Sequence, residues 1–149
     1  GAEAGVNARL MPALELGVSY GYAIHTYEEW QLNASTDYSG KEMETAPRQI
    51  GNTRLSYAPA GNKGWQATAE WVHLGSYWLD QANTQKYSGH DLLNLRGNLP
   101  LAAEWSLFAS LNNVTDRRYA ESASLSSGND VYAPGMPRTA YLGIEYKSK

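Results

Sequence analysis

The feature that most constrains this chain is a strict alternation of apolar residues with small or polar ones along unusually long segments. In the clearest segment, residues 14–24, the apolar residues share one parity: Leu14, Leu16, Val18, Tyr20, Tyr22 and Ile24. The residues between them are glycine, alanine, serine and glutamate. A period of two places successive side chains on opposite faces of a β-strand. The segment therefore predicts one strand with an apolar face and a polar face, about twice as long as an average strand.

The same alternation recurs in six further segments, which predicts an all-β, antiparallel sheet of about seven long strands. These segments span residues 2–10, 52–57, 65–71, 93–99, 105–112 and 139–146. Aromatic residues fall near the segment ends. We expect Tyr57, Trp65, Trp105 and Tyr146 at one rim and Tyr22, Tyr77 and Trp78 nearer the other, as in the aromatic girdles of a membrane protein.

The connections between these segments alternate between short and long. Residues 11–13, 58–64 and 100–104 are short and turn-like, whereas residues 31–45, 79–86 and 118–133 are longer and polar. Short periplasmic turns with longer extracellular loops are typical of a transmembrane β-barrel. No apolar run approaches the roughly 18–20 residues of a transmembrane helix, which says nothing of strands.

Two other architectures fit parts of this pattern. A soluble β-sandwich or lipocalin-like barrel would need every charge on the second face, such as Glu15, Arg54, Glu70 and Arg96, to face solvent. A membrane barrel explains both faces, because lipid meets the apolar one and a wet lumen meets the charged one. Seven strands are an odd number, so either a strand is missed or others precede Gly1. A small passive barrel or porin of eight strands is the remaining alternative.

Composition and spacing argue against an enzyme and against a metal protein. The chain has no cysteine, which excludes disulfides, thiolate metal sites and a cysteine nucleophile. His25, His73 and His90 stand alone without metal-ligand spacing. A net charge of −3 gives no electrostatic reason to expect nucleic acid. We therefore expect no catalytic residue, no metal site and no cofactor.

The C-terminal third carries two specific motifs. Residues 111–120 read Leu-Asn-Asn-Val-Thr-Asp-Arg-Arg-Tyr-Ala, and residues 134–139 read Pro-Gly-Met-Pro-Arg-Thr. They resemble the closing strands of TonB-dependent outer-membrane receptors, specifically over residues 87–146 and weakly over most of the chain. The residues that match the family's barrel motif, all structural, are Asn113, Asp116, Arg117, Tyr119, Pro134, Gly135, Pro137, Arg138, Gly143 and Tyr146.

The resemblance implies that residues 1–149 are the C-terminal part of a 22-stranded receptor barrel, whose plug domain and earlier strands are absent from this sequence. It implies a siderophore receptor in the outer membrane of a Gram-negative bacterium. Such a receptor imports a ferric siderophore with energy from TonB, which acts through the plug. Cobalamin, haem or another metal chelate is the alternative cargo.

The resemblance also implies two partners for the wall itself, outer-membrane lipid and the barrel-assembly machinery. That machinery recognises a last strand ending in an aromatic residue, any residue and phenylalanine. Here position 148 is serine, so either the assembly signal is weakened or the true C-terminus lies elsewhere.

The candidate ligand-binding residues are aromatic and cationic side chains expected near the extracellular mouth. They are Tyr27, Trp30, Tyr38, Arg48, Tyr77, Trp78, Tyr87 and Tyr132, with Arg54 and Arg96 on the polar face of the wall. Ferric chelates are often aromatic or anionic, so stacking and cationic donors would hold them. The alternative for each residue is a role in the girdle or in loop packing. The acidic residues Glu28, Glu29, Glu42 and Glu44 fit a solvated loop face better than a cation site.

Overall fold

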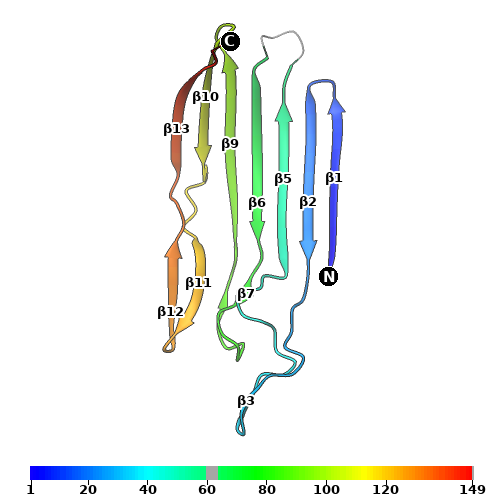
Figure 1. The fold of residues 1–149 in the computed structure, drawn as a ribbon, viewed down its shortest axis with the longest axis vertical. Helices are drawn as coiled ribbons and strands as arrows, with labels where there is room; N and C mark the ends of the chain where they lie inside the picture. Colours follow the sequence, from blue (N-terminus) through cyan, green and yellow to red (C-terminus); the bar gives the residue numbers. More distant parts are fainter. Residues whose placement is uncertain (60–63, 149) are drawn as a thin grey trace.

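Seven long strands lie side by side in one antiparallel sheet, in the order in which they follow along the chain (Figure 1). The computed structural model describes residues 1–59 and 64–148. The strands are β1 (Ala2–Met11), β2 (Leu14–Tyr22), β5 (Gln49–Tyr57), β6 (Gln66–Leu74), β9 (His90–Pro100), β10 (Trp105–Asn112) and β13 (Thr139–Tyr146). The predicted fold class and all seven predicted strands are confirmed.

The limits of five strands differ from the prediction. Strand β5 begins at Gln49 rather than at residue 52, β6 spans Gln66–Leu74 rather than 65–71, and β9 spans His90–Pro100 rather than 93–99. Strand β2 ends at Tyr22 rather than Ile24, because the chain leaves the sheet there: the Ala23 N–H donates to the Arg48 carbonyl at 3.0 Å, and Thr26 already bridges to Glu42 inside a loop. Strand β1 runs on to Met11, with a shift of register after Arg9. Of the turn predicted over 58–64, residues 60–63 lie outside the described residues.

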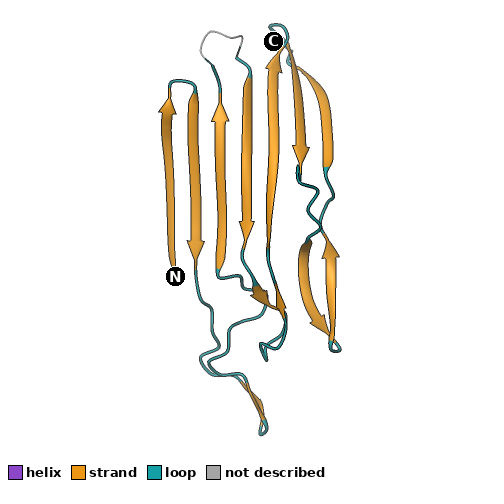
Figure 2. Cartoon of the chain, turned by 180° about the vertical axis from the view of Figure 1, so that it is seen from behind, coloured by secondary structure: helices purple, strands orange, loops and turns teal. Residues whose placement is uncertain are grey.

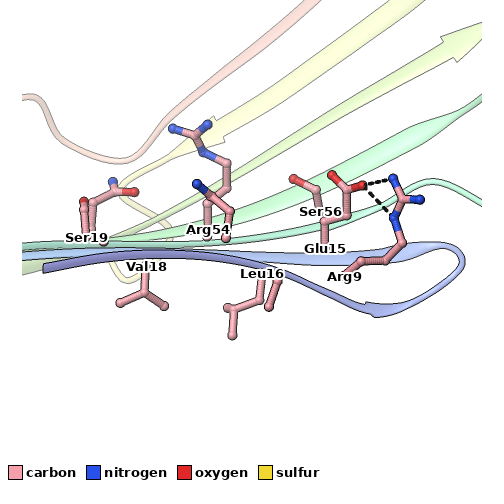
Figure 3. A pocket seen from close by; sticks show the side chains of 12 residues that line it. Arg9, Glu15, Leu16, Val18, Ser19, Arg54 and Ser56 are labelled. Carbon is pink, nitrogen blue, oxygen red and sulfur yellow. Dashed lines mark hydrogen bonds and ion pairs between the residues drawn. The ribbon is translucent and has the colours of Figure 1, made fainter.

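Over most of the wall, the register keeps apolar and charged side chains on opposite sides of the sheet. At the loop end Ile50 and Leu74 lie on the charged side, and the paired His73 and Asp91 lie on the apolar side. One row of paired residues crosses all seven strands and is apolar throughout: Ala8, Leu16, Leu55, Ala69, Leu95, Leu111 and Ala140. We call the side with this row the apolar face. The opposite side, which carries Arg9, Glu15, Arg54, Glu70 and Arg96, is the polar face. Figure 3 shows Leu16 and Val18 pointing away from the charged side chains.

The sheet is a single layer without a core of its own. Within residues 1–59 and 64–148, the buried hydrophobic residues are Tyr27, Tyr77, Leu79, Ala120 and Ala123, and none of them lies in the seven long strands. On the apolar face, Leu142 is 75% exposed and Ile144 62%. A β-sandwich would need a second sheet against this face, and the described part of the chain supplies none. The chain therefore forms a wall rather than a compact sandwich.

The connections lie at two opposite ends of this wall, as predicted. The short turns are at one end, and the long connections are at the other, which we call the loop end (Figures 1 and 2). The structure adds three small hairpins to the long connections: β3 (Gln31–Asn33) with β4 (Thr36–Asp37), β7 (Tyr77–Trp78) with β8 (Lys86–Tyr87), and β11 (Ala120–Ser126) with β12 (Asn129–Pro134). The β11–β12 turn has positive φ at Ser127 and Gly128 (51° and 78°), as a type I′ hairpin requires.

Aromatic pairs mark the rims of the apolar face. At the short-turn end, Tyr57 and Trp65 have ring centroids 5.4 Å apart, and Trp105 and Tyr146 are 4.7 Å apart. Towards the loop end, Trp71 stacks on His73 at 5.5 Å. Tyr77 and Trp78, expected near this outer rim, lie beyond the wall in the β7–β8 hairpin.

No helix among the described residues is long and apolar enough to cross a membrane.

If lipid covers the apolar face, a charged side chain on that face of β2 should destabilise the protein much more than one on the polar face. Val18→Lys would place an ammonium in hydrocarbon and lower the free energy of unfolding by about 2–4 kcal/mol. Ser19→Lys, the matched control one residue along, points to the polar face and should cost much less (Figure 3). Urea unfolding of the protein in lipid vesicles measures both. Equal losses would show that lipid does not distinguish the two faces.

Candidate functional site

The three long connections pack against one another in a continuous loop layer. Asn83 joins the first connection to the second: its Oδ1 accepts the Glu42 N–H at 2.9 Å, and its Nδ2 donates to the Glu42 carbonyl at 2.8 Å. Lys41 Nζ also donates to the Ala82 carbonyl at 2.6 Å. The second connection meets the third through the Leu125 N–H, which donates to the Leu79 carbonyl at 3.1 Å. The layer is therefore one unit at the loop end.

Arg48, a predicted ligand-binding residue, is paired inside this layer. Its guanidinium donates to both carboxylate oxygens of Glu42, at 2.7 and 2.6 Å, and the Trp78 Nε1–H donates to the same carboxylate at 3.1 Å. The Arg48 guanidinium, with the help of Trp78, holds the pKa of the Glu42 carboxyl below its ordinary value. The positive charge of Arg48 is thus largely balanced by Glu42, and its part in ligand binding stays a prediction.

Tyr27 and Trp30 form a packing centre within the first connection. The Tyr27 side chain is buried, its ring meets Trp30 edge-on at 4.3 Å between centroids, and its hydroxyl donates to Glu44. Burial and the Glu44 carboxylate raise the pKa of Tyr27 to about 12. Tyr38 is half-buried, and its N–H donates to the Trp30 carbonyl at 2.9 Å. These three predicted residues therefore lie together.

Tyr77 and Tyr87 hold the β11–β12 hairpin to the wall. The buried Tyr77 hydroxyl accepts the Ala123 N–H at 3.0 Å. The Tyr87 hydroxyl accepts the Ala120 N–H at 3.1 Å and hydrogen-bonds His90 Nδ1 at 2.9 Å. Burial raises the pKa of Tyr77. Both tyrosines anchor the hairpin, and their contact with a ligand stays a prediction.

The C-terminal motif residues meet where β10 ends and β13 begins. Asn113 is buried with φ of 50°, and its Nδ2 donates to the carbonyls of Arg117 and Met136 at 2.9 and 3.1 Å. The Arg138 N–H donates to Asp116 Oδ1 at 2.9 Å. The Asp116 carboxylate thus holds the backbone of Arg138 just before β13 begins.

Two motif glycines lie beneath aromatic rings. A Cβ at Gly135 would overlap the Tyr119 ring, and one at Gly143 would overlap the Phe108 ring, so neither position has room for a side chain. Pro134 ends β12, immediately before Gly135. Pro137, which precedes β13, accepts the Thr139 hydroxyl through its carbonyl at 2.8 Å. The contacts of these residues are with neighbouring parts of the fold.

A pocket of about 390 Å³ opens between the second and third connections. Three cationic residues and three tyrosines line it: Lys86, Arg117, Arg118, Tyr87, Tyr119 and Tyr132. We call it the cationic pocket. Sequence analysis selected Tyr87 and Tyr132 as ligand-binding residues and Arg117 and Tyr119 as motif residues, but missed Lys86 and Arg118. The adjacent arginines at 117 and 118 could have suggested a cationic site, whereas nothing in the sequence places the distant Lys86 beside them.

The polar face of the wall carries paired charges. Glu70 lies 3.5 Å from both Arg54 and Arg96, on the neighbouring strands β5 and β9, and Arg9 pairs with Glu15 at 2.8 Å. A shallow hollow of about 620 Å³ lies over this part of the face (Figure 3). In the part of the chain that the structure describes, no three His, Cys, Asp or Glu residues gather as a metal site would need.

The sequence matches the family described as TonB dependent receptor-like, beta-barrel, over residues 1–114. Because the match covers more than half of the chain, the chain belongs to this family. TonB-dependent receptors are transporters of the outer membrane of Gram-negative bacteria and are not enzymes. Transmembrane β-barrels of this kind present an apolar outer band to lipid. No curated protein matches the chain.

Solved receptor structures share this fold. The siderophore receptor PiuA from Acinetobacter baumannii has a TM-score of 0.74 at 18% identity, covering 97% of this chain and 21% of that chain. The ferric citrate transporter FecA, unliganded, has a TM-score of 0.73 at 24% identity, covering 89% and 21%. The copper transporter OprC has a TM-score of 0.69 at 21% identity, covering 97% and 22%. The chain thus spans about a fifth of each, and identities this low show the fold alone.

The Glu42–Arg48 pair predicts a pH-dependent loop layer. Because the folded state lowers the pKa of Glu42 from 4.5, the pair stabilises the layer above that pH and is lost as pH falls through the lowered value. Glu42→Gln should lower the free energy of local opening of the loop layer by about 1–2 kcal/mol at pH 7. The loss is modest because the pair is partly exposed. Hydrogen exchange of residues 41–48, corrected for the intrinsic rate, measures this.

The matched control is Glu28→Gln, an exposed change in the same connection. It should leave exchange in residues 41–48 unchanged at pH 7. Wild-type exchange that stayed constant between pH 7 and pH 3, or a control variant as labile as Glu42→Gln, would contradict the role of the pair.

Proposed function

We propose that the receptor containing this chain imports a ferric siderophore across the outer membrane, with energy delivered through TonB. Membership of the TonB-dependent receptor family is the observation that carries the proposal. The solved structures with this fold include receptors named for siderophores, ferric citrate and copper. A ferric chelate is therefore the cargo that the named neighbours favour.

In this proposal the wall forms no covalent bond with the cargo and catalyses no reaction of it. Its apolar face holds the protein in lipid, and its polar face gives a wet lining that charged solutes pass without entering hydrocarbon. Paired charges such as Arg9 with Glu15 suit such a lining, because each cation has a counter-charge within 2.8 to 3.5 Å. In this proposal TonB acts through a plug domain of the receptor.

The loop layer is the proposed place of first contact with cargo. Of the predicted residues, Tyr132 and Arg48 are exposed, while Trp30, Tyr38, Trp78 and Tyr87 are half-buried and present part of their side chains. Aromatic faces and charged donors together suit a chelate that is planar in part and anionic in part. Tyr27 and Tyr77 are buried, and in this proposal they support the layer.

Transport that depends on energy separates this proposal from a passive barrel. We expect cells that rely on this receptor to accumulate a labelled ferric siderophore, and to stop when TonB is removed. Uptake that continued at the same rate without TonB would contradict active import. Competition by cobalamin, haem or a copper chelate distinguishes the alternative cargoes.

A triple substitution tests the first connection. Trp30→Ala, Tyr38→Ala and Arg48→Gln together should weaken binding of the imported chelate by about tenfold or more, as for the loss of several aromatic and charged contacts. The control is Leu32→Ala, Ser35→Ala and Met43→Ala, all exposed in the same connection. Equal affinities in the two variants would remove the three residues from the binding surface.

A further inference from the structure

A polar pair lies on the apolar face of the wall, close to the loop end. His73 Nδ1 and Asp91 Oδ1 are 2.8 Å apart, and the two residues pair across β6 and β9. On this face of the seven described strands, Asp91 is the only acidic residue, and there is no lysine or arginine. The Asp91 side chain is 59% exposed. An ionised carboxylate that faced hydrocarbon would be strongly destabilising, so this end of the apolar face meets a polar layer.

Three aromatic rings lie beside this pair. The His73 ring stacks on Trp71, with centroids 5.5 Å apart and 26° between the planes. Gly51 lies between Tyr20 and His73 in the same row of paired residues. Because Gly51 has no side chain, its neighbours close over it: a Cβ there would be 3.5 Å from Tyr20 Cδ2 and 3.5 Å from His73 Cβ. We call Tyr20, Trp71, His73 and Asp91 the rim platform.

The rim platform lies where the apolar band of the wall ends. The exposed fractions of Tyr20 and Trp71 are 43% and 42%, so both rings are open to the surroundings of the wall. His73 is the last residue but one of β6, and Asp91 is the second residue of β9. In a transmembrane β-barrel the longer connections are extracellular, and aromatic girdles flank the apolar band at both interfaces. In that orientation the platform lies among the lipid headgroups of the outer leaflet.

The residues of the platform suit a sugar ring better than a phosphate. Asp91 repels a phosphate, and this face of the described strands has no cation to hold one. The C–H face of a sugar can pack on aromatic rings, and its hydroxyls can donate to a carboxylate. Asp91 also orients the imidazole: when Nδ1 of His73 donates to Asp91, Nε2 is left as an acceptor for a further hydroxyl. An ammonium headgroup is the competing ligand, because it too would contact a carboxylate and aromatic faces.

We infer that the rim platform binds the sugar headgroup of a glycolipid in the outer leaflet. The inference concerns the outer surface of the wall and does not depend on which cargo the receptor imports. The aromatic rings supply the stacking surface, and the Asp91–His73 pair supplies hydrogen-bond acceptors at its edge. A sugar held there would fix the depth of β6 and β9 in the membrane and keep the loop layer above the headgroups.

The test titrates three lipids with identical acyl chains into the receptor as the cell assembles it, purified in detergent. The probes are a monoglucosyl diacylglycerol, phosphatidylethanolamine and phosphatidic acid. They present a neutral sugar, an ammonium with a phosphate, and a phosphate alone. Native mass spectrometry measures the affinity for each lipid. We expect the glucosyl lipid to bind about fivefold or more tightly than either of the others.

Asp91→Ala and Trp71→Leu should each weaken binding of the glucosyl lipid by about fivefold or more. The first removes the acceptor of the hydroxyl groups, and the second removes a stacking surface. Asp91→Asn, which preserves the shape of the side chain, should also weaken binding because the acceptor loses its charge. The matched control is Trp105→Leu, a similarly exposed tryptophan on the same face at the short-turn end, which should leave the affinity unchanged. Equal urea midpoints of unfolding would show that all variants are folded.

Three outcomes would overturn the inference. Equal affinities for the three lipids would show that the platform does not select a headgroup. Tighter binding of phosphatidylethanolamine or phosphatidic acid would assign the platform to an ammonium or a phosphate. An affinity for the glucosyl lipid that either Asp91→Ala or Trp71→Leu left unchanged would place the sugar elsewhere on the receptor.

Discussion

Hydrocarbon neither donates nor accepts a hydrogen bond, and the rest of this structure depends on that fact. A backbone N–H or C=O left unpaired in lipid costs several kcal/mol. Each of the seven strands pairs with the next in antiparallel ladders, which leaves only the outer edges of β1 and β13 without a ladder among the described residues. Strands of eight to eleven residues are long enough to carry such ladders across most of a bilayer. The connections, where backbone groups are irregular, lie at the two ends.

The same demand fixes the register, because a slip by one residue would turn every side chain to the other face. The apolar row from Ala8 to Ala140 would then lie in the lumen, and Arg54 and Glu70 would enter lipid. Among the described residues, buried hydrophobic side chains gather in the loop layer, where Tyr77 and Leu79 pack beneath the β11–β12 hairpin. Order in the wall thus comes from ladders and lipid, whereas order in the loop layer comes from side-chain packing.

This division explains what the sequence could predict. The wall was predictable because alternation is local: the segment from Leu14 to Tyr22 shows its two faces without reference to any other strand. The family was predictable from local motifs around Asn113 and Gly135. The hairpins of the loop layer were missed, although the Ser127-Gly128 turn carried a usable signal.

The sequence predicted which types of residue occupy the candidate site, but not which residues contact one another there. Sequence reasoning selected exposed-looking aromatics and arginines, but it could not know that Arg48 would meet Glu42 or that Tyr77 would accept the Ala123 N–H. Lys86 and Arg118 approach one pocket only because β9 and β10 pair and return the chain to the loop end. Such gatherings depend on register between distant strands, which the sequence does not display.

The central claim is that one face of the sheet meets lipid and the other meets water. These 149 residues contain no cysteine. Single cysteines introduced along residues 14–22 can each carry a spin label in the assembled receptor in vesicles, with any cysteine elsewhere in the receptor replaced. Collisions with oxygen report lipid, and collisions with a water-soluble nickel chelate report the lumen. We predict strict alternation, with even-numbered positions in lipid. Labels that showed no alternation, or the opposite parity, would contradict the account.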